Sequence, residues 1–335
     1  MKRETEPFAH ADEIALEGQL RPSSLGEFVG QSKVKKQLEV LLQAAQEQNR
    51  VADHILFSGP PGLGKTTLAM IVAKETGRPL RVTSGPTIQH AGDLAAILSS
   101  LEHGEILFID EIHRVSRAAE EMLYLAMEDF RVDVMVGKGP GATSVPLDLE
   151  RFTLVGATTR AGMLPNPLRD RFGFTASMEF YDHGELISVL QRGAKVLGVT
   201  LDEDSLQLIA QSSRGTPRVA NRLLRRIRDY AQVQKVSAID AKTTASALEV
   251  YEIDATGLDR LDRQYLSALA ENRKRALGLG TLATRLGEEP ETIEMVVEPY
   301  LLRLGLIERT PKGRLITNSG LESMGIPSES SSLFD

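Results

Sequence analysis

The residues with the clearest chemical signal lie in 54–70, where a short apolar run meets a glycine-rich loop and then a run of helix-forming residues. Within this stretch, Gly59, Gly64, Lys65 and Thr66 fit the pattern G-x-x-x-x-G-K-[ST], in the strand-to-helix setting that a phosphate-binding loop requires. Small residues let backbone N–H groups close around phosphate oxygens, and the first helical turn adds partial positive charge. A structural turn that happens to end in Lys-Thr is the alternative, but the flanking signals favour a nucleotide site.

We predict that this loop binds the phosphates of a nucleoside triphosphate. Lys65 would contact the β- and γ-phosphates, and the Thr66 hydroxyl would hold Mg²⁺. The predicted phosphate contacts come from Gly62, Gly64, Lys65, Thr66 and Thr67.

Two adjacent carboxylates follow a second apolar run, at 105–109. Ligands of open α/β sheets sit at the carboxyl ends of the strands, which is where this run delivers Asp110 and Glu111. We expect Asp110 to orient Mg²⁺ and Glu111 to polarise the water that attacks the γ-phosphate. A solvated Asp-Glu pair capping a helix is the alternative. His113 nearby is typical of a packing or hydrogen-bonding residue rather than a catalyst.

Two further segments could complete the chemistry. Thr158 and Thr159 end another apolar run and could sense the γ-phosphate, although buried strands often end in threonine, so this assignment depends on its neighbours. Arg169 and Arg171 flank Asp170, which suggests either an internal ion-pair cluster or an arginine finger. A finger's guanidinium stabilises transition-state charge. The residues alone do not say which of the two arginines would act as a finger.

Composition limits the classes of protein that need to be considered. The 335 residues suggest two domains or three small ones, and 41% hydrophobic with 25% charged residues is ordinary for a globular protein. The absence of cysteine excludes disulfides and thiol catalysis. No signal peptide or membrane span is indicated, so we expect a cytoplasmic protein. The net charge of −7 means that nucleic acid would need a local basic patch.

The elements that must position these residues divide into three predicted domains. Residues 1–181 alternate apolar runs with helical patterns, which predicts an α/β domain with a parallel sheet; its last strand is expected at 176–181. Segments 131–136 and 144–149 alternate with period two and predict a hairpin. Its apolar residues would either pack on the parent domain or face a partner protein.

Residues 182–252 predict a small helical domain. Thr216 reads as a helix N-cap with Pro217 at the first helical position. Arg218 then lies in a first turn, where positive charge opposes the helix dipole. This placement suggests an anionic partner such as the bound nucleotide; a surface arginine is the alternative.

Residues 255–335 read as helix, helix-turn-helix and a two-stranded wing, which is the order of a winged helix. The expected recognition helix is acidic, whereas the wing is basic, so we infer that the wing meets DNA. A winged helix used for protein contacts is the alternative. The acidic set is Glu291, Glu294 and Glu298, and the basic set is Arg309, Lys312 and Arg314.

Taken together, these motifs resemble the RuvB family of AAA+ ATPases, over nearly the whole chain. The segments that carry the resemblance are 21–22, 30–31, 59–67, 107–114, 156–160, 167–173, 215–218, 298–301 and 309–314. The resemblance implies an AAA+ P-loop core, a helical lid and a winged-helix head, assembled as a homohexamer around duplex DNA. At 272–278 the chain departs from the usual pattern of the family.

The resemblance also implies roles for individual residues. Arg171 would enter the adjacent subunit's ATP site, Arg218 would be a second sensor and Tyr181 would lie near the nucleotide. Leu20 and Arg21 would border the adenine, unless they form a plain surface turn. We also predict that Glu128, Asp129 and Phe130 contact the nucleotide.

We therefore expect an ATP hydrolase that moves DNA and drives branch migration of Holliday junctions. The expected partners are a RuvA-type protein bound at the 131–149 hairpin and a RuvC-type resolvase in a larger complex. Two alternatives remain open from the sequence: a protein-remodelling AAA+ ATPase, and a winged-helix regulator in which Glu111 is catalytically idle.

Overall fold

A computed structural model describes residues 18–136, 143–273 and 275–327. Residues 1–17, the segment 137–142 between the two predicted hairpin strands, residue 274 and residues 328–335 lie outside the described residues. Contacts divide the chain into two compact units, with the division between Ser188 and Val189. Over the described part of the chain, no helix is both long and apolar enough to span a bilayer.

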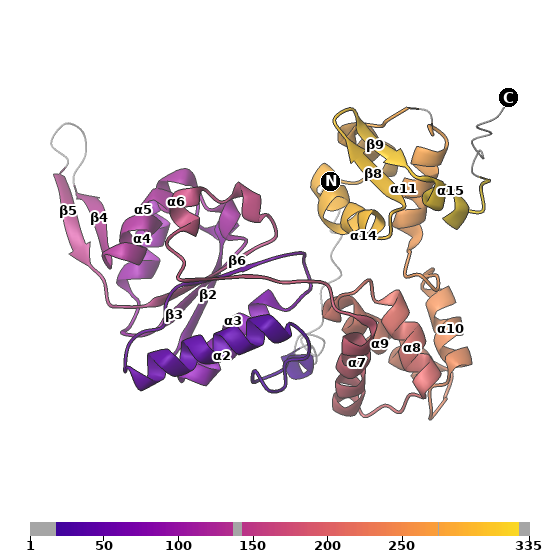
Figure 1. Cartoon of the computed structure of the whole chain (residues 1–335), viewed down its shortest axis with the longest axis horizontal. Coiled ribbons are helices and arrows are strands. Elements are labelled where there is room, and N and C mark those ends of the chain that lie inside the picture. Colours follow the sequence, from indigo (N-terminus) through magenta and orange to yellow (C-terminus); the bar gives the residue numbers. More distant parts are fainter. Residues whose placement is uncertain (1–17, 137–142, 274, 328–335) are drawn as a thin grey trace. The chain divides into compact units, whose positions relative to one another are not determined.

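The first unit is built on a parallel sheet, which confirms the predicted α/β class (Figure 1). Its five described strands run in the order β2-β3-β6-β1-β7. They are β1 (Ile55–Ser58), β2 (Leu80–Ser84), β3 (Ile106–Asp110), β6 (Thr153–Thr158) and β7 (Phe174–Ser177). The predicted last strand was placed too late: Phe174 pairs with Ile55, and the chain leaves the sheet after Ser177.

Helices cover both faces of this sheet. Helices α2 and α3 lie on one face, and α4, α5 and α6 lie on the other (Figure 1). Their bounds are α2 (Ser32–Glu47), α3 (Lys65–Thr76), α4 (Ala91–Ser99), α5 (Arg117–Glu128) and α6 (Asn166–Arg169). The three central strands β3, β6 and β1 are mostly apolar and buried, as expected for parallel strands covered on both faces. Phe57, Phe108 and Phe152 are fully buried there.

The predicted hairpin is confirmed as β4 (Arg131–Val136) paired antiparallel with β5 (Thr143–Asp148). Val132 is buried in the core beside α5. All of β5 is exposed, including the apolar side chains of Val145 and Leu147. The hairpin therefore packs on the parent domain at its base and presents apolar side chains on β5.

The second unit begins within α7 and continues with three more helices, and the predicted helix start at Thr216 lies immediately before one of them. The Thr216 hydroxyl accepts a hydrogen bond from the N–H of Val219, and Pro217 is the first helical residue, which confirms the predicted cap. The helices are α7 (His183–Leu197), α8 (Glu203–Ser212), α9 (Pro217–Val233) and α10 (Ala241–Val250).

The rest of the second unit is the predicted winged helix. Its elements are α11 (Arg260–Ala270), α12 (Leu279–Leu286), α13 (Pro290–Thr292), α14 (Glu298–Arg303), β8 (Ile307–Thr310), β9 (Gly313–Ile316) and α15 (Asn318–Ser323). A π-helical segment, Ile293–Val297, lies between α13 and α14 where a single helix was expected. Pro299 follows it and has no N–H to continue the regular ladder. Within 275–277, Leu277 pairs with Arg314 of β9.

Arg214 joins the segment before α9 to the winged helix. Its guanidinium donates to Asp259 at 2.7 Å and Asp262 at 2.6 Å and lies 5.3 Å from the centre of the Tyr300 ring. Burial raises the pKa of Asp262 to about 7, against the opposing effect of Arg214. The helical segment and the head are thus connected by a partly buried ion-pair cluster.

One interpretation of the winged helix was wrong. Glu298 is not part of an acidic helix surface that DNA could meet: it is fully buried beneath the wing and holds it. It accepts hydrogen bonds from Arg309 at 2.6 Å, Arg314 at 2.9 Å and the Tyr265 hydroxyl at 3.0 Å. Glu294 also lies near the wing, with its carboxylate 4.0 Å from Arg309, whereas Glu291 is exposed. Spacing along one helix could not show that the arginines of the wing would pair with Glu298.

We expect the Glu298→Ala substitution to lower the free energy of unfolding by about 3–5 kcal/mol, because it leaves two arginines without their buried acceptor. Urea denaturation of the full chain measures this change. Glu308→Ala, an exposed carboxylate on β8, is the matched control and should stay within about 0.5 kcal/mol of the parent. Equal losses from the two substitutions would contradict the anchoring role of Glu298.

Candidate nucleotide site and winged-helix surface

The phosphate loop joins the end of β1 to the start of α3. Gly64 has a φ of 100°, which a residue with a side chain rarely adopts, and a Cβ there would meet the Phe28 ring at 2.9 Å. The Lys65 ammonium is buried and donates to the carbonyl oxygens of Gly59 at 2.7 Å and Pro60 at 2.8 Å. Burial lowers the pKa of Lys65 to about 8, against the raising effect of Asp110 and Glu111.

The two predicted carboxylates lie at the same edge of the sheet as this loop. Thr66 and Asp110 bring oxygens within 3.5 Å of each other. Asp110 ends β3, and its other oxygen accepts from the N–H of Glu111 at 2.9 Å. The backbone of Glu111 adopts the left-handed conformation, with a φ of 47°. Its partly exposed carboxylate forms an ion pair with Arg114 at 3.1 Å. The Thr66 hydroxyl and the carboxylates of Asp110 and Glu111 therefore lie together beside the loop.

This donor set fits Mg²⁺. Mg²⁺ prefers hard oxygen ligands and is usually held by one or two protein groups, with waters and substrate phosphates completing the octahedron. The Thr66 hydroxyl and Asp110 carboxylate supply two such oxygens from neighbouring elements.

The structure distinguishes the two predicted threonines. Thr158 is fully buried at the end of β6, where its hydroxyl lies 3.0 Å from His113 Nδ1 and accepts from the N–H of Arg160. The hydroxyl of Thr159 is buried and has no hydrogen-bond partner among the described residues. The Thr159 hydroxyl is therefore available to bind a ligand. The Thr158 hydroxyl is instead engaged by His113, a contact that the sequence could not predict.

Of the residues expected near the nucleotide, Arg21 contacts α3 and Tyr181 contacts the loop. Leu20 is buried, and Arg21 lies 3.6 Å from the sulfur of Met70 on α3. The buried Tyr181 hydroxyl donates to the carbonyl of Leu63 within the loop at 3.4 Å, and burial raises the pKa of this phenol. Phe28, which packs on the loop at Gly64, was missed by sequence reasoning because a single aromatic in a turn has no specific pattern.

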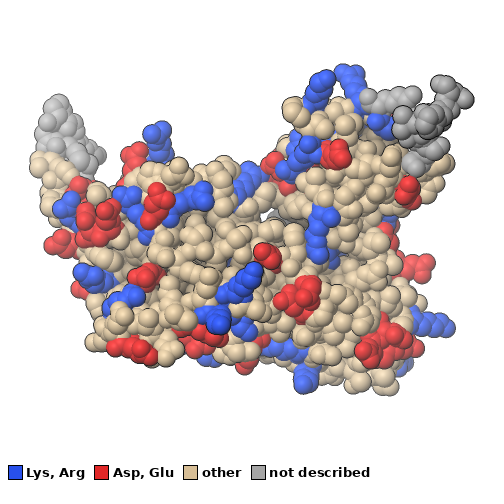
Figure 2. Space-filling model, in the orientation of Figure 1, with Lys and Arg blue, Asp and Glu red and all other residues tan. Residues whose placement is uncertain are grey.

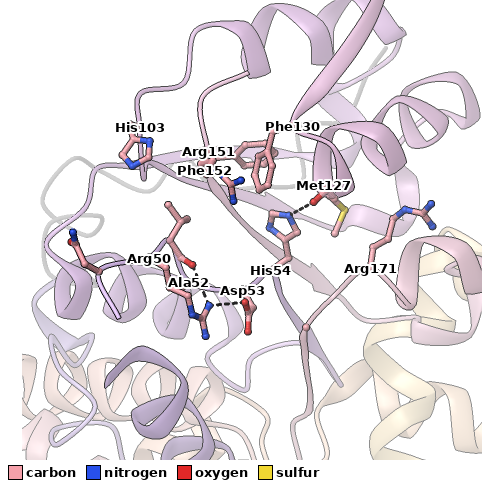
Figure 3. A pocket seen from close by; sticks show the side chains of 13 residues that line it. Arg50, Ala52, Asp53, His54, His103, Met127, Phe130, Arg151, Phe152 and Arg171 are labelled. Atoms are coloured by element: carbon pink, nitrogen blue, oxygen red, sulfur yellow. Dashed lines mark hydrogen bonds and ion pairs between the residues drawn. The ribbon is translucent and has the colours of Figure 1, made fainter. Parts of the chain in front are cut away.

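Arg171 lies at the opposite edge of the sheet, just before the start of β7. Its guanidinium donates to Glu128 at 2.7 Å and to the carbonyl of Pro167 at 2.7 Å. It is held by Glu128, not by the adjacent Asp170 that the sequence suggested. A cavity of about 530 Å³ lies beside it (Figure 3).

Glu128, Asp129 and Phe130 are also at this opposite edge. Phe130 packs against Phe152 and His54, which precede the strands β6 and β1. The structure therefore does not bring these three residues to the chain's own phosphate loop. The reason is that α5 returns the chain to the edge where the strands begin.

Arg218 is exposed in the first turn of α9, in the second unit. In the winged helix, Lys312 is exposed at the turn of the wing, while Arg309 is 40% exposed and Arg314 only 16% exposed. Figure 2 shows Lys and Arg side chains projecting at the end of the head that carries β8 and β9.

Family models match almost the full length of the chain. The RuvB P-loop domain model matches residues 20–178, the RuvB AAA lid model residues 181–254 and the RuvB winged-helix model residues 255–325.

Individual relatives and a solved structure agree with these models. The branch migration complex subunit RuvB of Clavibacter michiganensis is 61% identical over 96% of this chain and 89% of its own length, and that of Leifsonia xyli is 64% identical over 94% and 90%. The solved Thermotoga maritima RuvB motor is 45% identical with a TM-score of 0.85, over 92% of this chain and 99% of that one. The chain belongs to the RuvB family of P-loop ATPases.

Proposed function

We propose that this protein is an ATP-driven motor that moves duplex DNA and drives branch migration of Holliday junctions. The observation that carries the proposal is that one chain, matched throughout by RuvB models, combines a phosphate loop and paired carboxylates with a winged helix. We assign the ATPase core to residues 1–181, the lid to 182–252 and the DNA-binding head to 255–335. The basic wing favours DNA over a protein substrate.

Hydrolysis uses residues at the carboxyl edge of the sheet. Lys65 leaves the loop carbonyls and neutralises phosphate charge, and Glu111 orients and polarises the attacking water. Thr66 and Asp110 would hold Mg²⁺, which would supply further neutralisation of the phosphates. Thr159 donates its hydroxyl toward the γ-phosphate, while Thr158 fixes the end of β6 through His113.

The finger acts on a neighbouring subunit. Arg171 lies before β7, whereas the phosphate loop lies after β1, and β1 and β7 are parallel neighbours. The two groups are therefore at opposite edges of one sheet, and Arg171 cannot complete its own site. A closed ring, which we take to be a homohexamer, brings Arg171 with Glu128, Asp129 and Phe130 to the next subunit's ATP.

Partners follow from two surfaces. The exposed Val145 and Leu147 of the hairpin suit a RuvA-type junction-binding protein, with a RuvC-type resolvase joining the larger complex. The wing contacts duplex DNA through Lys312 and the outer parts of Arg309 and Arg314. Arg218 of the lid contacts the nucleotide and reports its state. Because the substrate is DNA, we place the activity in the cytoplasm.

Strand separation of a four-way junction, measured with a RuvA-type partner with and without ATP, tests the proposed function. The parent protein should separate the strands only when ATP is present. Glu111→Gln should bind ATP but lower kcat about 10²–10⁴-fold, because it loses the group that polarises the water. ATP hydrolysis by the parent protein without any junction movement would contradict the proposal.

The pKa of Lys65 predicts a pH-dependent ATP affinity. Because this lowered pKa is about 8, the ammonium is lost as pH rises through 8, well below the range for an ordinary lysine. We expect the Kd for ATP to rise about tenfold between pH 7 and pH 9. Lys65→Arg is the control, since a guanidinium stays charged throughout. Identical slopes for the parent and Lys65→Arg proteins would show that Lys65 does not titrate in this range.

The wing residues should differ in what they contribute. We expect Lys312→Ala to weaken duplex binding and to lower the slope of log K against log salt by about one, with unchanged Tm. Arg314→Ala should lower Tm as well, because its guanidinium bonds to the buried Glu298. Fluorescence anisotropy over a salt series and thermal melting measure the two effects. Unchanged DNA affinity in Lys312→Ala would remove the wing from the DNA interface.

A further inference from the structure

We infer that His54 is a positioning residue for the arginine finger: it fixes the last turn of α5, which in turn holds the Arg171 guanidinium. The inference rests on the proposed action of Arg171 in a neighbouring subunit. His54 precedes β1 and lies at the edge of the sheet where Arg171 is found, away from the chain's own phosphate loop (Figure 3).

Both ring nitrogens of His54 are engaged by backbone groups. The N–H of Leu154 donates to Nδ1 at 2.9 Å, so Nδ1 is the unprotonated nitrogen and Nε2 carries the hydrogen. Nε2 then donates to the carbonyl of Met127 at 3.0 Å. The ring is 7% exposed, and burial lowers its pKa, which favours this neutral form.

The carbonyl oxygen that accepts this hydrogen bond from His54 belongs to a helix end. Met127 is the second-last residue of α5, and the last four carbonyls of an α-helix have no intrahelical N–H partner. A buried carbonyl without a partner costs free energy comparable to a lost hydrogen bond. His54 therefore ties the end of α5 to the start of β1 and to β6.

The same end of α5 holds the finger. Glu128, the residue after Met127, pairs with Arg171 at 2.7 Å. The carbonyl of Tyr124, one turn earlier, accepts from Arg171 Nε at 3.2 Å, and the guanidinium lies 5.1 Å from the centre of the Tyr124 ring. Three of the contacts that set the direction of Arg171 thus come from the turn that His54 fixes.

The link between His54 and Arg171 runs through this turn and not through direct contact. Both residues line the cavity of about 530 Å³ in Figure 3, on either side of Met127. Phe130 and Phe152 pack on the His54 ring, with centroids 6.1 Å and 5.5 Å away, and hold it in place. Loss of the Nε2–H bond should therefore misplace the finger without touching the ATP site of the same subunit.

Two substitutions test whether the hydrogen bond to Met127, rather than the imidazole ring itself, is what matters at His54. His54→Asn keeps an oxygen near the Nδ1 position to accept from Leu154 but is too short to reach Met127. His54→Gln carries an N–H donor at about the reach of Nε2. We expect His54→Asn to lower kcat about 10–100-fold, since small misplacements of catalytic groups have effects of this size, with the Kd for ATP unchanged. His54→Gln should recover most of the activity.

Mixed rings identify whose site is damaged. His54→Asn subunits with a faulty finger keep a sound ATP site, so mixing them with Lys65→Ala subunits, which keep a sound finger, should restore ATP hydrolysis. Mixing them with Arg171→Ala subunits should restore nothing, because both lack a working finger. Size-exclusion chromatography of differently tagged subunits verifies that they assemble together.

The outcomes distinguish this inference from the proposal beneath it. The control mixture of Arg171→Ala with Lys65→Ala should regain activity; if it does not, the finger does not act between subunits and both ideas fail. If the control succeeds, restoration of His54→Asn by Arg171→Ala overturns the inference, because the damage then lies in its own site. Full activity of His54→Asn, or no restoration by Lys65→Ala, also overturns it.

Discussion

The constraint on which the rest of this structure depends is the common direction of the strands in the central sheet. Because all five described strands are parallel, residues that follow strands collect at one edge and residues that precede strands collect at the other. The phosphate loop, Asp110 and Thr159 all follow strands. Arg171 and His54 both precede them. A single subunit therefore carries the two halves of the proposed catalytic site, facing away from each other along the strands.

This separation explains why each edge needs its own support. At the carboxyl edge, the loop carbonyls hold Lys65, Arg114 holds Glu111, and His113 holds Thr158. At the amino edge, backbone carbonyls and Glu128 hold Arg171 before any neighbour is present. Both sets are positioned by contacts within the subunit, so assembly would bring together two preformed halves.

The winged helix uses buried charge in a different way. Glu298 lies beneath the wing and accepts hydrogen bonds from two of the three basic residues that the sequence suggests for DNA binding. Removing either arginine would therefore disturb the wing's structure as well as its charge. The connection from Arg214 to Asp259 and Asp262 joins this head to the segment that precedes Arg218. The start of α9, which carries Arg218, is thus linked to the head through the ion pairs of Arg214.

Local patterns predicted much of this fold and of its nucleotide site. The phosphate loop, the strand before Asp110, the hairpin and the Thr216 cap each depend on neighbouring residues and were placed correctly. Contacts between distant segments could not be predicted from spacing: His113 with Thr158, His54 with Met127, and Phe28 with the loop. The burial of Glu298 could not be predicted either, because it depends on Arg309, Arg314 and Tyr265 from other segments. Nor could the position of Glu128, Asp129 and Phe130 be predicted, because the sequence does not say at which edge of the sheet α5 ends.

The central claim is that no subunit can complete its own ATP site. The most direct test is the rate of ATP hydrolysis per subunit, measured over the protein concentrations at which the assembly dissociates and with subunit state followed by analytical ultracentrifugation. The account predicts that this rate falls toward zero as monomers form, while ATP binding per subunit persists. A rate per subunit that stays constant down to the monomer would contradict it.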